Sequence, residues 1–254
     1  MAITLPTSIV KATTQDPKNL ILFGAPKVGK TTILSTLENC LILDFEQGSD
    51  YVDALKLKVD SVAALKEICV EIKKAGKPYK FIAIDTITAL AEFVKPIALK
   101  DYLATEAGQK NLAKLMTQGK SEKDINLLTL PFGAGYLHIK DAINKVIKLV
   151  SQVTDHVIIV GHVKLSAVDG GDESDVSKNL DLPGQAKRSL AAESDAIGFV
   201  YRDENSNLCI NFSSDGVECG ARPRHLANQR IVVAEMQEDG SFAPYWDRVY
   251  PSLN

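Results

Sequence analysis

Residues 24–31, with the sequence GAPKVGKT, have the types and spacing that bind a polyphosphate. They match the phosphate-loop pattern G-x-x-x-x-G-K-[ST], whose glycines let the backbone fold tightly around phosphate groups. Backbone N–H groups and a helix N-terminus then supply positive potential. We expect Lys30 to reach the β- and γ-phosphates and the Thr31 hydroxyl to ligate Mg²⁺. The predicted nucleotide-binding residues are Gly24, Ala25, Pro26, Lys27, Val28, Gly29, Lys30, Thr31 and Thr32.

A second metal contact is predicted at Asp85. Four apolar residues, 81–84, precede this acid and indicate a buried strand. The carboxyl ends of parallel strands face the ligand in open α/β sheets, so Asp85 would hold Mg²⁺ or its water shell. The alternative is that Asp85 caps the helix that follows.

Glu46 is the candidate for activating water. It lies just past the apolar segment 40–45, and a carboxylate there can accept a proton from water or orient it. Asp44, on the same predicted strand, is the second choice, and an exposed turn acid is the alternative for Glu46. His162 follows another apolar segment, 157–161, and would contact the γ-phosphate; the alternative is a hydrogen-bonded strand end.

The elements that must position these residues alternate along the chain. Strands are predicted at 19–23, 40–45, 55–59 and 79–84. Helices are predicted at 30–38, 61–75, 86–105 with a break at Pro96, and 106–118.

The second half is expected to begin with an irregular segment, 121–135, and an amphipathic helix whose apolar face runs from Ile139 to Val150. A strand at 156–161 and a long polar loop at 164–185 follow. The predicted strands of the last part are 195–201, 208–212 and 230–234.

This pattern predicts an α/β fold with a mostly parallel, doubly wound sheet and a C-terminal antiparallel extension. Residues 1–18 are predicted to form an N-terminal arm, and residues 19–254 a single domain.

Composition narrows the class of protein. The chain has 254 residues, with 45% hydrophobic and 24% charged residues, as is ordinary for a globular protein. The sequence predicts no signal peptide and no membrane span. The cysteines, Cys40, Cys69, Cys209 and Cys219, form no C-x-x-C pair, which indicates reduced thiols and a cytoplasmic location. A net charge of −3 excludes a uniformly basic surface but not a local nucleic-acid groove.

The order of these features resembles the RecA-like branch of phosphate-loop ATPases. It is most similar to small phage-encoded RecA-like proteins, reduced to the ATPase core, that act in single-strand annealing recombination. The narrower resemblance rests on FGAGY at 132–136, GHVK at 161–164 and AAESDAIG at 191–198 followed by Tyr201-Arg202. It covers roughly residues 19–235 and implies a RecA-like core with ATP and Mg²⁺ as cofactors.

The resemblance also implies two DNA-binding loops, around 130–136 and 163–187. Aromatic side chains in the first would stack on the bases of single-stranded DNA, whereas the alternative for Tyr136 is a core helix position. Acids at 169–175 in the second loop would repel phosphates. The predicted DNA-binding residues are Phe132, Tyr136, Lys164, Lys178, Lys187 and Arg188.

The chain departs from this group in two places. RecA-like proteins usually carry glutamine at the position of His162, and they have late-strand lysines that reach a neighbour's ATP site. The segment 208–212 has no lysine. Arg222, Arg224 and Arg230 are the nearest replacements, although a solvated loop is the alternative for 222–224. By resemblance, Asp50 or Tyr51 would contact the adenine.

Two functions from different classes follow. The first is an ATPase that forms a homo-oligomer, a ring or a filament, on single-stranded DNA with ATP near the subunit boundary. The second is a nucleotide-dependent interaction module that recruits a single-strand-binding, replication or recombination protein with little hydrolysis. A helicase motor or loader ranks lower, because no separate substrate domain is evident.

Overall fold

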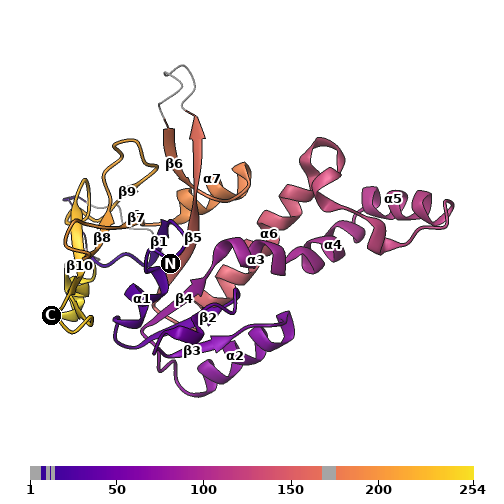
Figure 1. The fold of residues 1–254 in the computed structure, drawn as a ribbon. Helices are drawn as coiled ribbons and strands as arrows, with labels where there is room; N and C mark the ends of the chain where they lie inside the picture. Colours follow the sequence, from indigo (N-terminus) through magenta and orange to yellow (C-terminus); the bar gives the residue numbers. More distant parts are fainter. Residues whose placement is uncertain (1–6, 10–11, 13–14, 168–175) are drawn as a thin grey trace.

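The computed structural model describes residues 7–9, 12, 15–167 and 176–254. Within these residues, Figure 1 shows a central twisted sheet with helices on both faces. The described part of the chain contributes 11 strands to this sheet, whose main path runs β11-β10-β8-β7-β1-β5-β4-β2-β3, with β6 paired to β5 and β9 paired to β7. The segment from β7 to β3 is parallel, and the strands beyond β7 are antiparallel. The predicted fold class is therefore confirmed.

Among the described strands, eight overlap the predicted strand segments, whereas β6, β9 and β11 were not predicted. The strands span β1 Asn19–Gly24, β2 Cys40–Asp44, β3 Lys56–Lys58, β4 Phe81–Asp85, β5 His156–Ala167, β6 Val176–Leu180, β7 Ala196–Arg202, β8 Leu208–Asn211, β9 Gly220–Ala221, β10 Arg230–Met236 and β11 Phe242–Pro244. The central strands are apolar throughout because helices or the C-terminal segment cover both of their faces. Along β1, Leu20 and Leu22 belong to one core cluster and Ile21 and Phe23 to the other.

The helices are α1 Lys30–Ser35, α2 Val62–Lys74, α3 Ile87–Phe93, α4 Lys95–Leu103, α5 Glu106–Met116, α6 Ala134–Ser151 and α7 Gly184–Glu193. Their termini carry the expected signals: the Ser61 side chain accepts a hydrogen bond from the Ala64 N–H at the start of α2. The predicted helix at 86–105 is divided at Val94, directly before the Lys95-Pro96 start of α4.

A helical arm extends from the sheet. It consists of α4, α5 and the first turns of α6, joined by the short 3-10 turns η2 Glu122–Asp124, η3 Leu127–Thr129 and η4 Pro131–Gly133. Figure 1 shows this arm reaching away from the strands on one side of the molecule. The predicted irregular segment at 121–135 corresponds to these turns.

The prediction of a long loop at 164–185 is wrong. β5 continues to Ala167 and pairs antiparallel with β6, and α7 follows from Gly184. The two strands form a ribbon that projects from the sheet (Figure 1). A projecting two-stranded ribbon leaves side chains in water, so its strands need no continuous apolar run. Their polar sequence therefore has the composition that the prediction assigned to a loop. The acids at 169–175 lie outside the described residues.

The C-terminal segment packs on the helix that follows the phosphate loop. Trp246 begins the 3-10 turn η5, Trp246–Arg248, and its indole N–H donates to the Ile33 carbonyl at 3.1 Å and to Thr36 Oγ1 at 3.0 Å. Both acceptors lie at the end of α1, where the Thr36 hydroxyl also donates to the Ile33 carbonyl at 2.8 Å. The turn η1, Ser49–Tyr51, follows β2, and η6, Pro251–Leu253, ends the chain.

Among the described residues, no helix has the length and apolar character needed to cross a membrane. The described cysteines are all free, with Cys40, Cys69 and Cys209 buried.

Replacing Trp246 with phenylalanine should lower the free energy of unfolding by about 2 kcal/mol. The Thr36 hydroxyl loses the indole donor, the Ile33 carbonyl keeps only its bond from the Thr36 hydroxyl, and the smaller ring fills less of the buried space. Urea unfolding followed by circular dichroism measures this, since Trp246 is the single tryptophan. The matched control is Tyr245→Phe, which removes an exposed hydrogen bond to Glu235 and should change stability by less than about 0.5 kcal/mol. Equal stability of the two variants would refute the role of the indole.

Candidate functional site

The register of the parallel strands brings the predicted site residues to one edge of the sheet. Gly24 at the end of β1 lies opposite His162 on β5, and Asp85 at the end of β4 lies opposite Val160. Asp44 at the end of β2 lies opposite Asp85. The phosphate loop, Glu46 and Asp85 therefore meet at the carboxyl ends of the strands, where open α/β sheets bind ligands.

Lys30 is held inside the phosphate loop. Its ammonium group donates to the Gly24 carbonyl at 3.2 Å and to the Ala25 carbonyl at 2.9 Å. Burial lowers the pKa of Lys30, and the negative charges of Asp85 and Glu46 partly oppose that effect. Gly29, which precedes α1, has φ of 112°, a conformation that residues with a Cβ rarely adopt.

Thr31 and Asp85 form the predicted metal-binding pair. The Thr31 hydroxyl donates to Asp85 Oδ2 at 2.7 Å. Asp85 is 6% exposed, and this burial raises the pKa of its carboxyl, while the Thr31 hydrogen bond works in the opposite direction. A buried carboxylate beside a hydroxyl is a suitable oxygen donor set for Mg²⁺.

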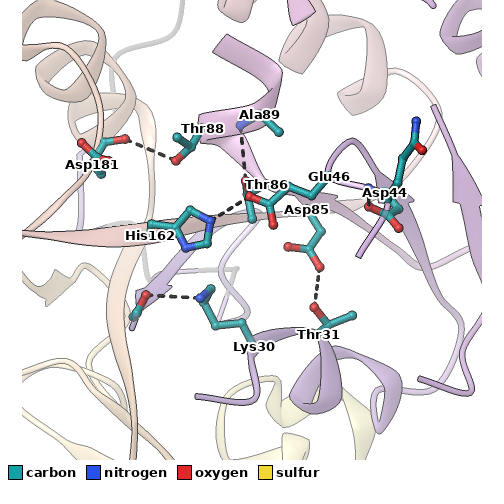
Figure 2. A network of polar contacts seen from close by, with 12 residues as sticks. Lys30, Thr31, Asp44, Glu46, Asp85, Thr86, Thr88, Ala89, His162 and Asp181 are labelled. Atoms are coloured by element: carbon teal, nitrogen blue, oxygen red, sulfur yellow. Dashed lines mark hydrogen bonds and ion pairs between the residues drawn. The ribbon is translucent and has the colours of Figure 1, made fainter. Parts of the chain in front are cut away.

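Glu46 lies at the centre of a polar network (Figure 2). Its Oε1 accepts a hydrogen bond from the Thr86 hydroxyl at 2.7 Å and lies 2.7 Å from His162 Nε2. Because a carboxylate only accepts, this contact places a proton on Nε2. His162 Nδ1 is buried and has no hydrogen-bond partner among the described residues. Thr86 also caps α3, accepting from the Ala89 N–H.

Asp44, the second choice for water activation, has a structural role instead. Its two oxygens accept from the Gln47 N–H at 2.7 Å, the Ser49 N–H at 3.0 Å and the Ser49 hydroxyl at 2.6 Å. These bonds hold the turn after Glu46. Of the two acids, Glu46 is therefore the one whose carboxylate points toward the other site residues.

A pocket of about 500 Å³ contains these groups. Its volume lies within the range of small-ligand sites. The Tyr51 side chain is fully exposed at this pocket, whereas Asp50 forms an ion pair with Lys58 at 2.9 Å. Its lining includes Pro26, Lys27, Gly29, Lys30, Thr31, Thr32, Asp44, Glu46, Tyr51, Asp85, Thr86 and His162. The residues present thus fit a nucleoside triphosphate with Mg²⁺.

The predicted DNA-binding residues do not form one cluster. On the β5–β6 ribbon, Lys164 lies opposite Asn179 and Leu165 opposite Lys178. Residues that lie opposite share a face and neighbours alternate, so Lys164 and Lys178 are on opposite faces of the ribbon. Figure 1 shows the ribbon and the helical arm at separate places on the body.

The other predicted DNA-binding residues differ in their exposure. Phe132 is fully exposed in the arm, and Tyr136 is 37% exposed, so Tyr136 is not a buried core residue. Lys187 pairs with Glu218 at 2.8 Å, while Arg188 is exposed.

The three arginines that could replace the late-strand lysines also differ in their contacts. Arg222 donates to the Ala192 carbonyl at 2.6 Å and faces Asp195. Arg230 faces Asp215 at 3.5 Å. Both arginines therefore have partners within the chain, and Arg224 is exposed.

Sequence reasoning missed two residues beside the site. Thr86 was not predicted to bind Glu46, although its position directly after Asp85 was a usable signal. Arg202 ends β7, the neighbour of β1, and its Nε donates to the Val28 carbonyl of the phosphate loop at 3.1 Å. The strand order that places β7 beside β1 could not be read from the sequence.

A phosphate loop at the end of a central parallel strand, with acids at the ends of neighbouring strands, defines a P-loop nucleoside-triphosphatase domain. The model of the AAA domain family matches residues 16–234. The chain therefore belongs to the AAA domain family of P-loop ATPases. Among curated proteins, none matched the chain.

Substitution of Asp85 by asparagine should make the ligand-free protein more stable at pH 7. The pKa of this acid is raised above its ordinary value of 3.8 in the folded state, so its ionisation lowers the free energy of unfolding as the pH rises above that value. We expect a melting temperature a few degrees above wild type at pH 7, with a difference that shrinks toward pH 4.

Thermal unfolding from pH 4 to pH 8 in metal-free buffer tests this expectation. Asp141→Asn, at an exposed position on α6, is the control and should show no such trend. A lower stability of Asp85→Asn across the whole range would contradict the electrostatic account.

Proposed function

We propose that the chain binds ATP with Mg²⁺ and hydrolyses it. The observation that carries this proposal is the convergence of Lys30, the Thr31–Asp85 pair and Glu46 on one pocket, from three different elements of the fold. Hydrolysis needs a phosphate cradle, a metal contact and a group that orients water. Each of these requirements has a residue in the pocket.

Each side chain would have a defined part. Lys30 would exchange the Gly24 and Ala25 carbonyls for phosphate oxygens. The Thr31 hydroxyl and Asp85 would hold Mg²⁺, which neutralises phosphate charge when bound. Glu46 would orient a water molecule and accept its proton.

Thr86 and His162 fix where the Glu46 carboxylate points, because both contact the same oxygen, Oε1. The other carboxylate oxygen is left for water. His162 lies within β5, which continues without interruption into the projecting ribbon. A displacement of His162 on contact with the γ-phosphate would therefore be transmitted along β5 to the ribbon.

We further propose that the chain is a RecA-like, phage-encoded protein that assembles on single-stranded DNA and promotes annealing. The support is the ribbon downstream of His162, with exposed Lys164 and Lys178, together with the fully exposed Phe132. Basic side chains bind the DNA backbone, and exposed aromatic rings stack on unpaired bases. A homo-oligomer, a ring or a filament, would place ATP near the subunit boundary.

Glu46→Gln should retain ATP binding and lose hydrolysis by a factor of about 10²–10⁴, because the amide cannot accept a proton. Lys30→Ala should lose ATP binding. Single-turnover hydrolysis and equilibrium binding of a fluorescent ATP analogue separate the two effects. Glu67→Gln, at an exposed position on α2, should behave as wild type. Unchanged hydrolysis by Glu46→Gln would remove Glu46 from the reaction.

Combined replacement of Lys164 and Lys178 by alanine should weaken ATP-dependent binding to single-stranded DNA and reduce its salt dependence. Each lost phosphate contact lowers the slope of log K against log salt by roughly 0.7. Because the two lysines lie on opposite faces of the ribbon, a strand bound to one face loses one contact, and we expect a decrease of about 0.7. Fluorescence anisotropy of a labelled oligonucleotide at several salt concentrations measures it.

The control replaces Lys66 and Lys73, which are exposed on α2, by alanine, and DNA binding should be unchanged. If the wild-type protein binds ATP but no single-stranded DNA, the annealing proposal is wrong. The nucleotide-dependent interaction module then becomes the better account.

A further inference from the structure

Arg202 touches the phosphate loop from outside the nucleotide pocket. Its Nε donates to the Val28 carbonyl at 3.1 Å, and one terminal nitrogen lies 3.2 Å from the point where a Cβ on Gly29 would stand. Arg202 is not among the residues that line the pocket. It therefore contacts the backbone of the loop and not the space for the ligand.

The guanidinium is held in place by the C-terminal part of the sheet. Its second terminal nitrogen donates to the Ser206 carbonyl at 3.0 Å, within the turn that joins β7 to β8. Asp203 braces this turn by accepting from the Asn205 and Asn207 N–H groups. The guanidinium also lies 5.5 Å from the centre of the Phe242 ring on β11.

The contact with Val28 decides which way one peptide unit of the loop faces. A trans peptide is planar, and its carbonyl and its N–H point in opposite directions. Because the Val28 carbonyl points outward to Arg202, the Gly29 N–H points away from Arg202. Gly29 and Lys30 line the pocket, so that N–H is turned toward the ligand side.

We propose that Arg202 is a positioning residue that fixes the Val28–Gly29 peptide so that the Gly29 N–H is available to a phosphate group. This inference rests on the proposed nucleotide binding and identifies a residue on which it depends. Leu208 packs against the same part of the loop: its side chain stands 2.8 Å from the point where a Cβ on Gly29 would lie, so a larger residue at position 29 would clash with it. Arg202 acts through the backbone and does not contact the reacting atoms.

An oriented N–H contributes to the ground state and the transition state alike, because loop amides bind phosphates throughout the reaction. Loss of such uniform binding raises KM and leaves kcat nearly unchanged. Arg202→Ala should accordingly weaken the binding of ATP and of ADP equally. We expect a loss of affinity of about tenfold, which is the upper range for one hydrogen bond. Arg202→Lys, which keeps a donor and a charge, should recover part of the affinity.

Arg248 provides a matched control. Like Arg202, it lies in the C-terminal part, donates to a backbone carbonyl, Val232 at 2.9 Å, and lies over an aromatic ring, Tyr245 at 4.2 Å. Among the described residues, its hydrogen bond and its ring contact lie on Val232 and Tyr245 and not on the phosphate loop. Arg248→Ala should therefore lose similar local packing without any change in nucleotide affinity.

The experiment measures equilibrium binding of fluorescent ATP and ADP analogues, steady-state KM and kcat, and the melting temperature of the full chain with and without nucleotide. The inference predicts a raised KM, an unchanged kcat and a smaller nucleotide-induced stabilisation for Arg202→Ala alone. Wild-type affinity in Arg202→Ala, or an equal loss in Arg248→Ala, would overturn it. If the wild-type chain itself binds neither nucleotide, the proposed function fails instead, and the two failures are thereby distinguished.

Discussion

The parallel register of β2, β4, β5 and β1 is the constraint on which the site depends. It places Asp85 opposite Val160 and Gly24 opposite His162, so that residues distant in sequence meet at one edge. The ends of these strands align because their side chains are buried on both faces of the sheet. A slip of one strand by one residue would move each of its side chains to the opposite face. Hydrophobic packing therefore sets the distances between the polar groups.

The same packing buries charged groups at the site, which is energetically unfavourable. Lys30 and Asp85 are both largely buried. Burial lowers the pKa of Lys30 and raises the pKa of Asp85, so it favours the neutral form of each group. Charged groups in such a position are costly unless they are paired. The loop carbonyls hold Lys30 and the Thr31 hydroxyl holds Asp85. A ligand that brings phosphate oxygens and a cation would satisfy the same groups more completely.

The C-terminal extension completes the region around the phosphate loop. Trp246 covers the end of α1, and Arg202 and Leu208 approach the loop from its outer side. The antiparallel strands thus do more than widen the sheet. They support the short helix and the loop that the parallel strands alone would leave open on one face.

The sequence alone predicts the parallel core and the positions of the phosphate loop, Glu46, Asp85 and His162, because apolar strands that end in polar residues are local signals. It did not reveal the β5–β6 ribbon, whose polar strands lack the apolar pattern of a buried sheet. Three-dimensional packing places Asp44 within a turn and brings Glu46 into contact with Thr86 and His162. It also places Lys164 and Lys178 on opposite faces of the ribbon and brings Arg202 to the loop. These contacts depend on strand order and register. Both arise from packing across the whole chain, and no local sequence pattern indicates them.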